Sequence, residues 1–279
     1  MSTTYPCFDV TVSDKVAHIQ LSRPDELNTM IPSFWSDLPV IVSELSARGD
    51  VRAIVISSTG KHFSAGMDLS VFTSSGLSMD GEPGRRNASF MLLVKRLQES
   101  FTALERARVP VLAAIQGGCI GGAVDMVCAA DMRYASQDAY FVIQETNIGM
   151  TADVGTLQRL PKLIPDGIAR ELVYTGRRMP AARAKEVGLV NEVFDDHESL
   201  VAGVLEIAAE IATKSPLTLW GAKEALVYAR DHGVADSLHQ IALWQTGAFQ
   251  PADMMESFAA KGEKRAAEYE DLPPAPSGI

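Results

Sequence analysis

Residues 111–130 read VLAAIQGGCIGGAVDMVCAA, and the strongest fold signal of the chain lies here. The first five residues form a continuous apolar run, which is typical of a strand covered on both faces of a sheet. GGCIGG follows as a glycine-rich turn, and the apolar AVDMVCAA has the composition of a buried helix. A strand, a turn and a helix in this order make half of a βαβ unit, so the stretch predicts an α/β fold with a parallel sheet.

The flanking sequence continues this alternation. Residues 8–14 and 16–22 alternate apolar and polar side chains around a short polar break, which predicts a hairpin. Residues 31–49 have helical periodicity ending at a glycine, and the β-branched run 51–59 predicts a buried strand. The remaining elements expected from the pattern are a helix at 91–108, a strand at 133–145, helices from Glu198 onward, and a frayed Pro-rich tail at 271–279.

The composition is that of a globular protein. The 279 residues are 47% hydrophobic and 22% charged, which excludes disorder, collagen and coiled coil as descriptions of the whole chain. The net charge of −10 opposes non-specific attraction to nucleic acid or anionic lipid. The first residues lack the features of a signal peptide, and no uncharged apolar stretch approaches the roughly 18 residues of a membrane span. We therefore expect a soluble cytoplasmic protein.

Common cofactor and metal motifs are missing from the sequence. There is no GxGxxG fingerprint, Gly60-Lys61 is followed by His62 and not by the Ser or Thr of a P-loop, and FSAG lacks the first glycine of a GxSxG elbow. The five histidines have no metal-ligand spacing, and the three cysteines have no CxxC spacing. We expect no metal, and free thiols in a reducing compartment.

Two glycine turns offer backbone amides for chemistry. Gly121 and Gly122 lie where a strand turns into a helix, so their amides point outward from a helix N-terminus and suit a developing negative charge. The turn in FSAGMDL, residues 63–69, also follows a strand. Amides from both turns converging on one oxygen would form an oxyanion hole. The alternative is that both are tight turns with a structural role only.

Three carboxylates accompany these turns. Asp125 lies in the first turn of the apolar helix, Glu145 ends an apolar strand, and Asp153 lies in the loop that follows. Asp125 has a structural alternative as a helix N-terminal charge, and Asp153 as an N-cap of the next helix. Glu145 is harder to explain structurally, because open α/β sheets place their chemistry at strand ends. Asp131 differs, because Arg133 nearby favours a structural ion pair.

Five stretches together resemble the crotonase family, the enoyl-CoA hydratase/isomerase superfamily. They are SRPDELNTM, KHFSAGMDL, AAIQGGCIGGAVDM, AADMRYAS and SFAAKGEKRAAEY, and the resemblance covers nearly the whole chain. It implies a spiral of ββα and βαβ turns over residues 1–197, with the catalytic and CoA-binding site, and a helical oligomerisation region over 198–279. It also implies a homotrimer or a dimer of trimers, with the amides of Met67 and Gly122 as the oxyanion hole.

The same resemblance implies an acyl-CoA thioester as substrate, with coenzyme A as part of the substrate and no separate cofactor. The residues that it assigns to substrate binding are Arg23, Leu27, Lys61, Phe63, Ala65 and Asp68 in the N-terminal half, and Phe258 and Lys261 on a C-terminal helix that can meet CoA from a neighbouring subunit.

The carboxylates indicate the reaction within the family. Hydratases of the family carry Glu at both positions that match Asp125 and Glu145, and hold one water between them. Asp125, Glu145 and Asp153 together look like the Δ3,5-Δ2,4-dienoyl-CoA isomerases, which act in fatty acid β-oxidation. That resemblance implies Asp153 as the base at C2, Glu145 as the acid at C6, and Asp125 as a residue that orients or tunes the site. Crowding should couple the three titrations.

Other functions remain as alternatives. Within the family these are an enoyl-CoA hydratase, a Δ3-Δ2-enoyl-CoA isomerase, or an enzyme that acts on an unusual acyl group. Outside catalysis, the alternative is a family member that binds acyl-CoA or RNA, against which the intact carboxylates and the charge of −10 both weigh.

Overall fold

The computed structural model describes residues 5–68, 70–71, 81–249 and 251–276. Within them, the larger sheet has the strand order β1-β2-β3-β4-β6-β9, and the smaller sheet has the order β5-β7-β8. The predicted hairpin is the antiparallel pair β1 and β2, and the other pairs of the larger sheet are parallel. The strands are β1 (Phe8–Ser13), β2 (Val16–Leu21), β3 (Ala53–Ser58), β4 (Val111–Ile115), β5 (Gly118–Ile120), β6 (Met132–Ser136), β7 (Tyr140–Val142), β8 (Met179–Pro180) and β9 (Glu192–Phe194).

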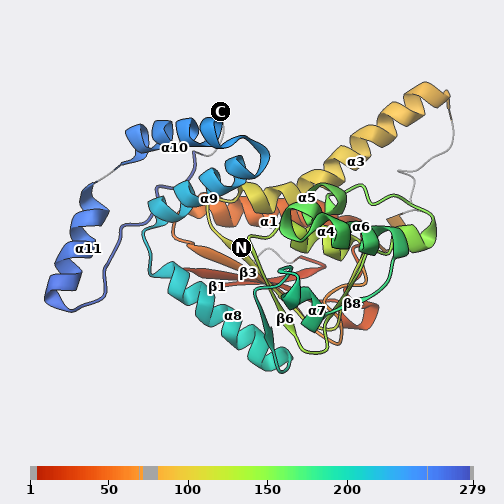
Figure 1. The fold of residues 1–279 in the computed structure, drawn as a ribbon, viewed down its shortest axis with the longest axis horizontal. Helices are drawn as coiled ribbons and strands as arrows, with labels where there is room; N and C mark the ends of the chain where they lie inside the picture. The colour runs from red at the N-terminus through yellow and green to blue at the C-terminus, as the bar shows by residue number, and fades with distance from the viewer. Residues whose placement is uncertain (1–4, 69, 72–80, 250, 277–279) are drawn as a thin grey trace.

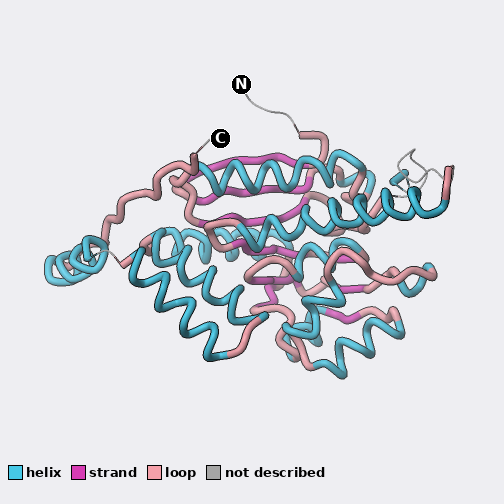
Figure 2. Tube along the Cα trace, turned by 90° about the horizontal axis from the view of Figure 1, so that it is seen from above, coloured by secondary structure: helices cyan, strands magenta, loops and turns pink. Residues whose placement is uncertain are grey.

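Helices lie on both sides of the larger sheet (Figures 1 and 2). The helix α8 covers one face, and α1, α3 and α4 lie on the other. The helices are η1 (Pro24–Glu26), α1 (Pro32–Arg48), α3 (Pro83–Arg106), α4 (Gly122–Cys128), η3 (Thr146–Ile148), α5 (Thr156–Leu163), α6 (Asp166–Thr175), α7 (Ala181–Glu186), α8 (His197–Ala212), α9 (Pro216–Asp231), α10 (Val234–Ala248) and α11 (Pro251–Glu263).

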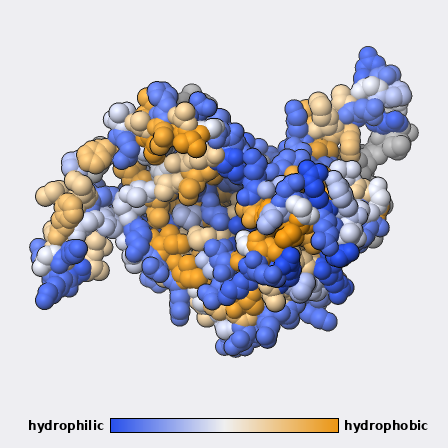
Figure 3. Space-filling model, viewed as in Figure 1, coloured by the Kyte–Doolittle hydropathy of each residue, from blue (hydrophilic) through white to orange (hydrophobic). Residues whose placement is uncertain are grey.

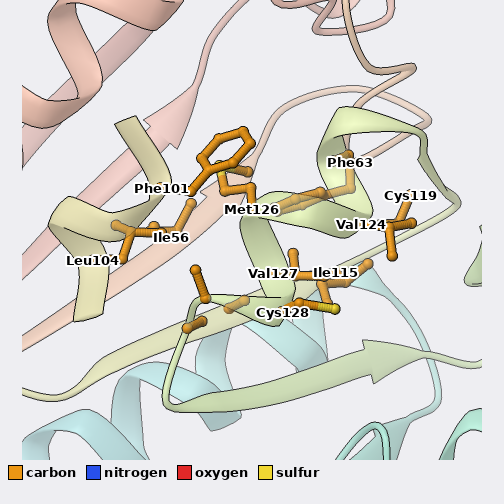
Figure 4. Packing of buried hydrophobic residues seen from close by; sticks show 14 of the residues in the cluster. Ile56, Phe63, Phe101, Leu104, Ile115, Cys119, Val124, Met126, Val127 and Cys128 are labelled. Atoms are coloured by element: carbon orange, nitrogen blue, oxygen red, sulfur yellow. The ribbon is translucent and has the colours of Figure 1, made fainter. Parts of the chain in front are cut away.

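The central strands are apolar on both faces because both faces are covered. Along β3, Ile54 and Ile56 belong to the cluster under α1, α3 and α4, whereas Val55 belongs to the cluster under α8. Successive side chains of a strand point to opposite faces, so a continuous β-branched run fills both layers. Figure 4 shows Met126 and Val127 of α4 packed into the first of these clusters.

The predicted strand 133–145 is two strands in different sheets. β6 ends at Ser136, and β7 begins at Tyr140 in the smaller sheet. Between them Ala139 N donates to Ser136 O at 3.0 Å, which closes a tight turn. The turn is marked in the sequence only by the exposed Gln137 and Asp138, a polar break too short to distinguish two strands from one.

The predicted fraying of the tail at 271–279 is wrong for its described part. Asp271 forms an ion pair with the buried Arg52 at 3.0 Å, and the amide of Ala275 donates to the carbonyl of Ala47 at 2.8 Å. A Pro-rich composition does not reveal such contacts, because the partners lie more than 200 residues away in the chain. The last three residues lie outside the described part.

The expected ion pair between Asp131 and Arg133 is also wrong. Asp131 instead contacts the buried Lys223 of α9 at 2.8 Å and accepts from the amide of Val111 at 2.7 Å. Arg133 donates to backbone carbonyls, among them that of Ala130 at 2.7 Å. Asp131 therefore links α9 to β4 of the larger sheet.

The predicted helical region after Glu198 is present as α8 to α11. α8 packs on the larger sheet, whereas α11 stands apart from the body in both views (Figures 1 and 2). Large apolar side chains are exposed on α10 and α11, and Figure 3 shows apolar side chains gathered over α9 and α10 at the upper left. Among the described residues, no helix combines the length and apolar character that crossing a membrane requires.

Candidate active site

A cavity of about 540 Å³ lies between the two glycine turns and the loop that follows β7. β5 and β7 are paired in parallel, with Ile120 opposite Val142, so the segments that follow them emerge at the same edge. This arrangement brings the glycine turn after β5 next to the loop that carries Glu145. The cavity is lined by Thr29, Ala65, Met67, Asp68, Gly121, Gly122, Gln144, Glu145, Ile148, Met150, Asp153 and Val154.

The two glycine turns are bonded to each other. Ser64 N donates to Gly118 O and Ile120 N donates to Ser64 O, both at 3.1 Å. Gly66 has a φ of +85°, and a Cβ there would lie 2.5 Å from Ile120 O and 3.3 Å from Gly122 N. Only glycine fits this position, because the turns approach each other more closely than a side chain permits.

Met67 and Gly122, whose amides the family resemblance implies as the oxyanion hole, both line the cavity. A Cβ built on Gly122 lies 3.9 Å from Met67 N, so the two peptide groups are near neighbours. Within the described part of the chain, neither amide has a hydrogen-bond partner. Two unpaired donors on one cavity wall are suited to bind a single oxygen that gains negative charge.

Glu145 stands directly beside this wall. Its Oε1 lies 3.2 Å from where a Cβ of Gly121 would be. Burial raises the pKa of Glu145 to about 7, and the negative charge of Asp125 adds to the shift. A carboxyl group with this pKa can both take up and release a proton near neutral pH.

Asp125 lies beneath the cavity and does not line it. Its side chain is fully buried, and Oδ1 accepts from the amide of Thr156 at 2.5 Å. Oδ2 has no hydrogen-bond partner among the described residues. Burial raises the pKa of Asp125 to about 6.

The N-terminus of α5 is not capped by the residue that the sequence analysis gave as a structural alternative. Its N-cap is Gly155, without a side-chain cap, so the alternative of Asp153 as the N-cap is wrong. Asp125 caps the helix from α4, 31 residues earlier, through its bond to Thr156 N. Asp153 is thereby left without a capping role.

Asp153 is half-buried and lines the cavity with Glu145. Burial raises its pKa. Its backbone carbonyl accepts from Gln98 Nε2 of α3 at 2.7 Å. Sequence reasoning did not identify Gln98, because a polar residue on an amphipathic helix has no distinguishing pattern.

Some of the expected substrate-binding residues line the cavity and others do not. Ala65 and Asp68 line it, and Asp68 Oδ2 accepts from the Thr29 hydroxyl at 2.8 Å. Phe63 is fully buried in the hydrophobic core and does not line it, and Figure 4 shows it pointing into the cluster.

The other expected residues lie outside the cavity wall. Arg23 Nη1 donates to Thr29 O at 2.8 Å, so Arg23 stands at the edge of the site. Leu27 is exposed and its carbonyl accepts from Ala65 N at 3.0 Å, while Lys61 is exposed. Phe258 and Lys261 are exposed on α11, which the described chain does not bring to its own cavity.

Comparison with known proteins gives consistent similarities. The sequence matches the enoyl-CoA hydratase/isomerase family over residues 11–272. It is 42% identical to the mitochondrial Δ(3,5)-Δ(2,4)-dienoyl-CoA isomerase of Mus musculus, over 94% of this chain and 81% of that protein. It is 38% identical to the peroxisomal Δ(3,5)-Δ(2,4)-dienoyl-CoA isomerase of Arabidopsis thaliana, over 92% and 93%. An enoyl-CoA hydratase structure from Bacillus anthracis superposes with a TM-score of 0.84 at 29% identity, over 94% and 98%.

Proposed function

The chain belongs to the enoyl-CoA hydratase/isomerase family, and from this premise we propose that it converts a 3,5-dienoyl-CoA into the conjugated 2,4-dienoyl-CoA. The observation that carries the proposal is the cavity itself: two carboxylates, Glu145 and Asp153, line it together with the unpaired amides of Met67 and Gly122. The similarity to relatives named as dienoyl-CoA isomerases supports the same reaction.

The first step uses the two amides and one carboxylate. The thioester carbonyl accepts hydrogen bonds from Met67 N and Gly122 N, which stabilises an enolate oxygen and acidifies C2. A carboxylate removes the C2 proton, and the negative charge spreads along the diene. A second carboxyl group then delivers a proton to C6, which leaves double bonds at C2 and C4. Protons and electrons balance without an external oxidant or reductant, so we propose that no separate cofactor takes part.

The two carboxylates that line the cavity are assigned to the two proton transfers as the family resemblance implies. We propose Asp153 as the base at C2 and Glu145, whose Oε1 lies close to Gly121, as the acid at C6.

Asp125 acts indirectly in this proposal. Its charge helps to raise the pKa of Glu145, and its bond to Thr156 N anchors the helix that follows Asp153. Asp125 is fully buried and is not among the residues that line the cavity, so we propose that it tunes Glu145 and does not contact the substrate.

Substitution of Asp153 by Asn tests the reaction. The variant keeps the shape of the side chain but removes its acid–base function, so isomerisation should fall about 100- to 10,000-fold. The assay follows the ultraviolet absorbance of the conjugated product, with a panel of enoyl-CoA and dienoyl-CoA substrates. Faster hydration of a 2-enoyl-CoA than isomerisation of the diene by the parent enzyme would refute the proposal, as would an Asp153→Asn variant with parental turnover.

We also propose that residues 198–279 provide the contacts of a homotrimer or a dimer of trimers. Support comes from exposed apolar side chains on these helices, namely Val234, Leu238, Leu243, Phe249, Met255 and Phe258. A neighbouring copy could then bring its own α11 to the CoA of this site. Light scattering at micromolar concentration should give a multiple of the 30.1 kDa chain mass. A stable monomer would contradict the assembly.

We propose that the enzyme acts in the β-oxidation of unsaturated acyl chains. The relatives compared above are named as mitochondrial and peroxisomal proteins. The reducing, cytoplasmic location expected from the sequence stays a prediction, and Cys7, Cys119 and Cys128 are buried free thiols in keeping with a reducing environment.

A further inference from the structure

One face of α3 is turned toward the segment that carries Asp153. Gln98, Thr102 and Glu105 are spaced by four and three residues, which places them on one side of a helix. We call these three residues the α3 stripe and residues 153–159 the Asp153 segment. Gln98 Nε2 donates to the carbonyl of Asp153 at 2.7 Å, so the first member of the stripe holds the residue that carries the carboxylate.

The other two members of the stripe hold Arg159, at the far end of the Asp153 segment. Glu105 accepts from Arg159 Nε at 3.1 Å and from Nη2 at 2.9 Å, a bidentate pair. The Thr102 hydroxyl accepts from the same Nη2 at 3.2 Å. Both charged side chains are nearly buried, at 12% and 10% exposure, so water screens their attraction little. Arg230 of α9 also pairs with Glu105.

Arg159 in turn fills the space beside the backbone of the segment. Gly155 has a φ of +139°, and a Cβ there would lie 1.8 Å from Arg159 Nη1. The same Nη1 reaches the carbonyl of Val154 at 3.4 Å. The guanidinium group therefore occupies the space that a side chain at Gly155 would need, and it donates to the carbonyl of the peptide between Val154 and Gly155.

A cavity of about 310 Å³ lies between the segment and α3, lined by residues of both. Val154 of the segment and Phe101 of α3 belong to one hydrophobic cluster, and the hydrogen bonds and the ion pair add directional contacts to this packing. A shift of about 1 Å in a group that transfers protons can cost about 100-fold in rate.

We propose that Gln98 and Glu105 are positioning residues, which set where the Asp153 carboxylate stands along the acyl chain. The inference rests on the proposed isomerase function. It assigns to one helix face the placement of the Asp153 carboxylate. Glu145 lies in the loop after β7, outside the Asp153 segment, and no hydrogen bond joins it to the α3 stripe among the described residues.

Two variants test the inference, with a matched control. Gln98→Met keeps the length of the side chain but removes the donor to Asp153 O, and Glu105→Gln keeps the shape but disrupts the bidentate pair. Glu99→Gln is the control, because Glu99 pairs with Arg106 on the exposed side of the same helix. Thermal melting verifies that each variant is folded.

The decisive measurement separates the two ends of the reaction. Each enzyme converts a 3,5-dienoyl-CoA in D2O, and mass spectrometry compares deuterium in recovered substrate with product formed. We expect kcat to fall about 10-fold in Gln98→Met and about 10- to 100-fold in Glu105→Gln, with KM within about threefold. The ratio of exchange to product should shift in the same direction as in Asp153→Asn, and Glu99→Gln should match the parent.

The other outcomes overturn the inference. Parental kcat in a folded Gln98→Met variant would show that the bond to Asp153 does not place the carboxylate. A fall in kcat with an unchanged exchange ratio would show a general loss of structure. If Glu105→Gln does not fold, Gln98→Met decides alone, since it removes a single bond of a half-buried side chain. A parent enzyme without isomerase activity would refute the proposed function, and this inference with it.

Discussion

Substitution of Gly66 by Ala tests the oxyanion hole through backbone geometry alone. A Cβ at this position would meet Ile120 O at 2.5 Å and Gly122 N at 3.3 Å, so one glycine turn has to move away from the other. The positive φ of +85° adds a conformational cost of about 1–2 kcal/mol for any residue with a Cβ. The movement separates the amides of Met67 and Gly122, which should lower kcat by at least the roughly 100-fold that is lost with one oxyanion donor.

Gly188 provides a matched control for this prediction. Its φ of +86° is nearly the same, but a Cβ there has no neighbour within 4 Å. Gly188→Ala should therefore pay the backbone cost of about 1–2 kcal/mol in unfolding free energy and keep the parental kcat. Urea unfolding measures the stability of both variants, and the ultraviolet rise of the conjugated product measures turnover.

Comparison of the two variants separates the effect of the close contact between the two glycine turns from the cost of a positive φ. Equal turnover in Gly66→Ala and Gly188→Ala would refute the reasoning, because the same strain would then have no effect on the amides. A Gly66→Ala variant that loses stability far beyond the control but keeps kcat would show that the contact is structural only.

Two further predictions concern titration of the site. In Asp125→Asn, removal of the neighbouring negative charge lowers the pKa of Glu145. The inflection of the pH profile of kcat/KM near pH 7 should therefore move down by about 1 pH unit. An unmoved inflection would contradict the electrostatic coupling between Asp125 and Glu145. Glu145 has its pKa raised from 4.5 to about 7, so its contribution to stability is present below about pH 4.5 and is lost as pH rises through about 7. In Glu145→Gln, the decrease in unfolding free energy between about pH 5 and 8 should therefore be smaller by roughly 1–2 kcal/mol, which urea unfolding at both pH values measures.

The parts of the fold that the sequence predicts are those with a local pattern. The run 51–59 is rich in β-branched residues, and the structure places β3 there, buried along its whole length because both faces of the strand are covered. The helix ending at Gly49 was predicted from its periodicity and its terminal glycine, and α1 ends at Arg48. Each of these features depends on neighbours within a few residues, so a single sequence contains the necessary information.

Contacts between distant segments were not predictable in the same way. Asp271 looked like part of a frayed tail, and its partner Arg52 is 219 residues away. Asp131 was paired with Arg133 because the two are close in sequence, whereas Lys223 is the partner in space. A local charge pair is the simplest reading of a sequence, but packing of α9 brings a cation from another part of the chain.

The residues of the candidate site also divide into those that a local sequence pattern predicts and those that depend on contacts between distant segments. The glycine turns and the three carboxylates were identified from residue types at strand ends, and the structure brings four of these elements to one cavity. Phe63 was expected near the substrate but lies in the core, because an aromatic residue in a motif can serve packing as well as binding. Gln98 was missed, since its bond to Asp153 depends on how α3 crosses the loop.

The placement of Asp125 connects local structure to the type of reaction. A free N-terminus of α5 needs an acceptor, and Gly155 cannot provide one from its side chain. Asp125 satisfies Thr156 N from below the cavity, and its short side chain stays buried there. Of the three carboxylates predicted from the sequence, Glu145 and Asp153 then line the cavity, and Asp125 does not. Isomerisation of a 3,5-diene needs one carboxyl group to take a proton from C2 and another to deliver one to C6, and Glu145 and Asp153 are the two that the structure leaves at the cavity for these roles.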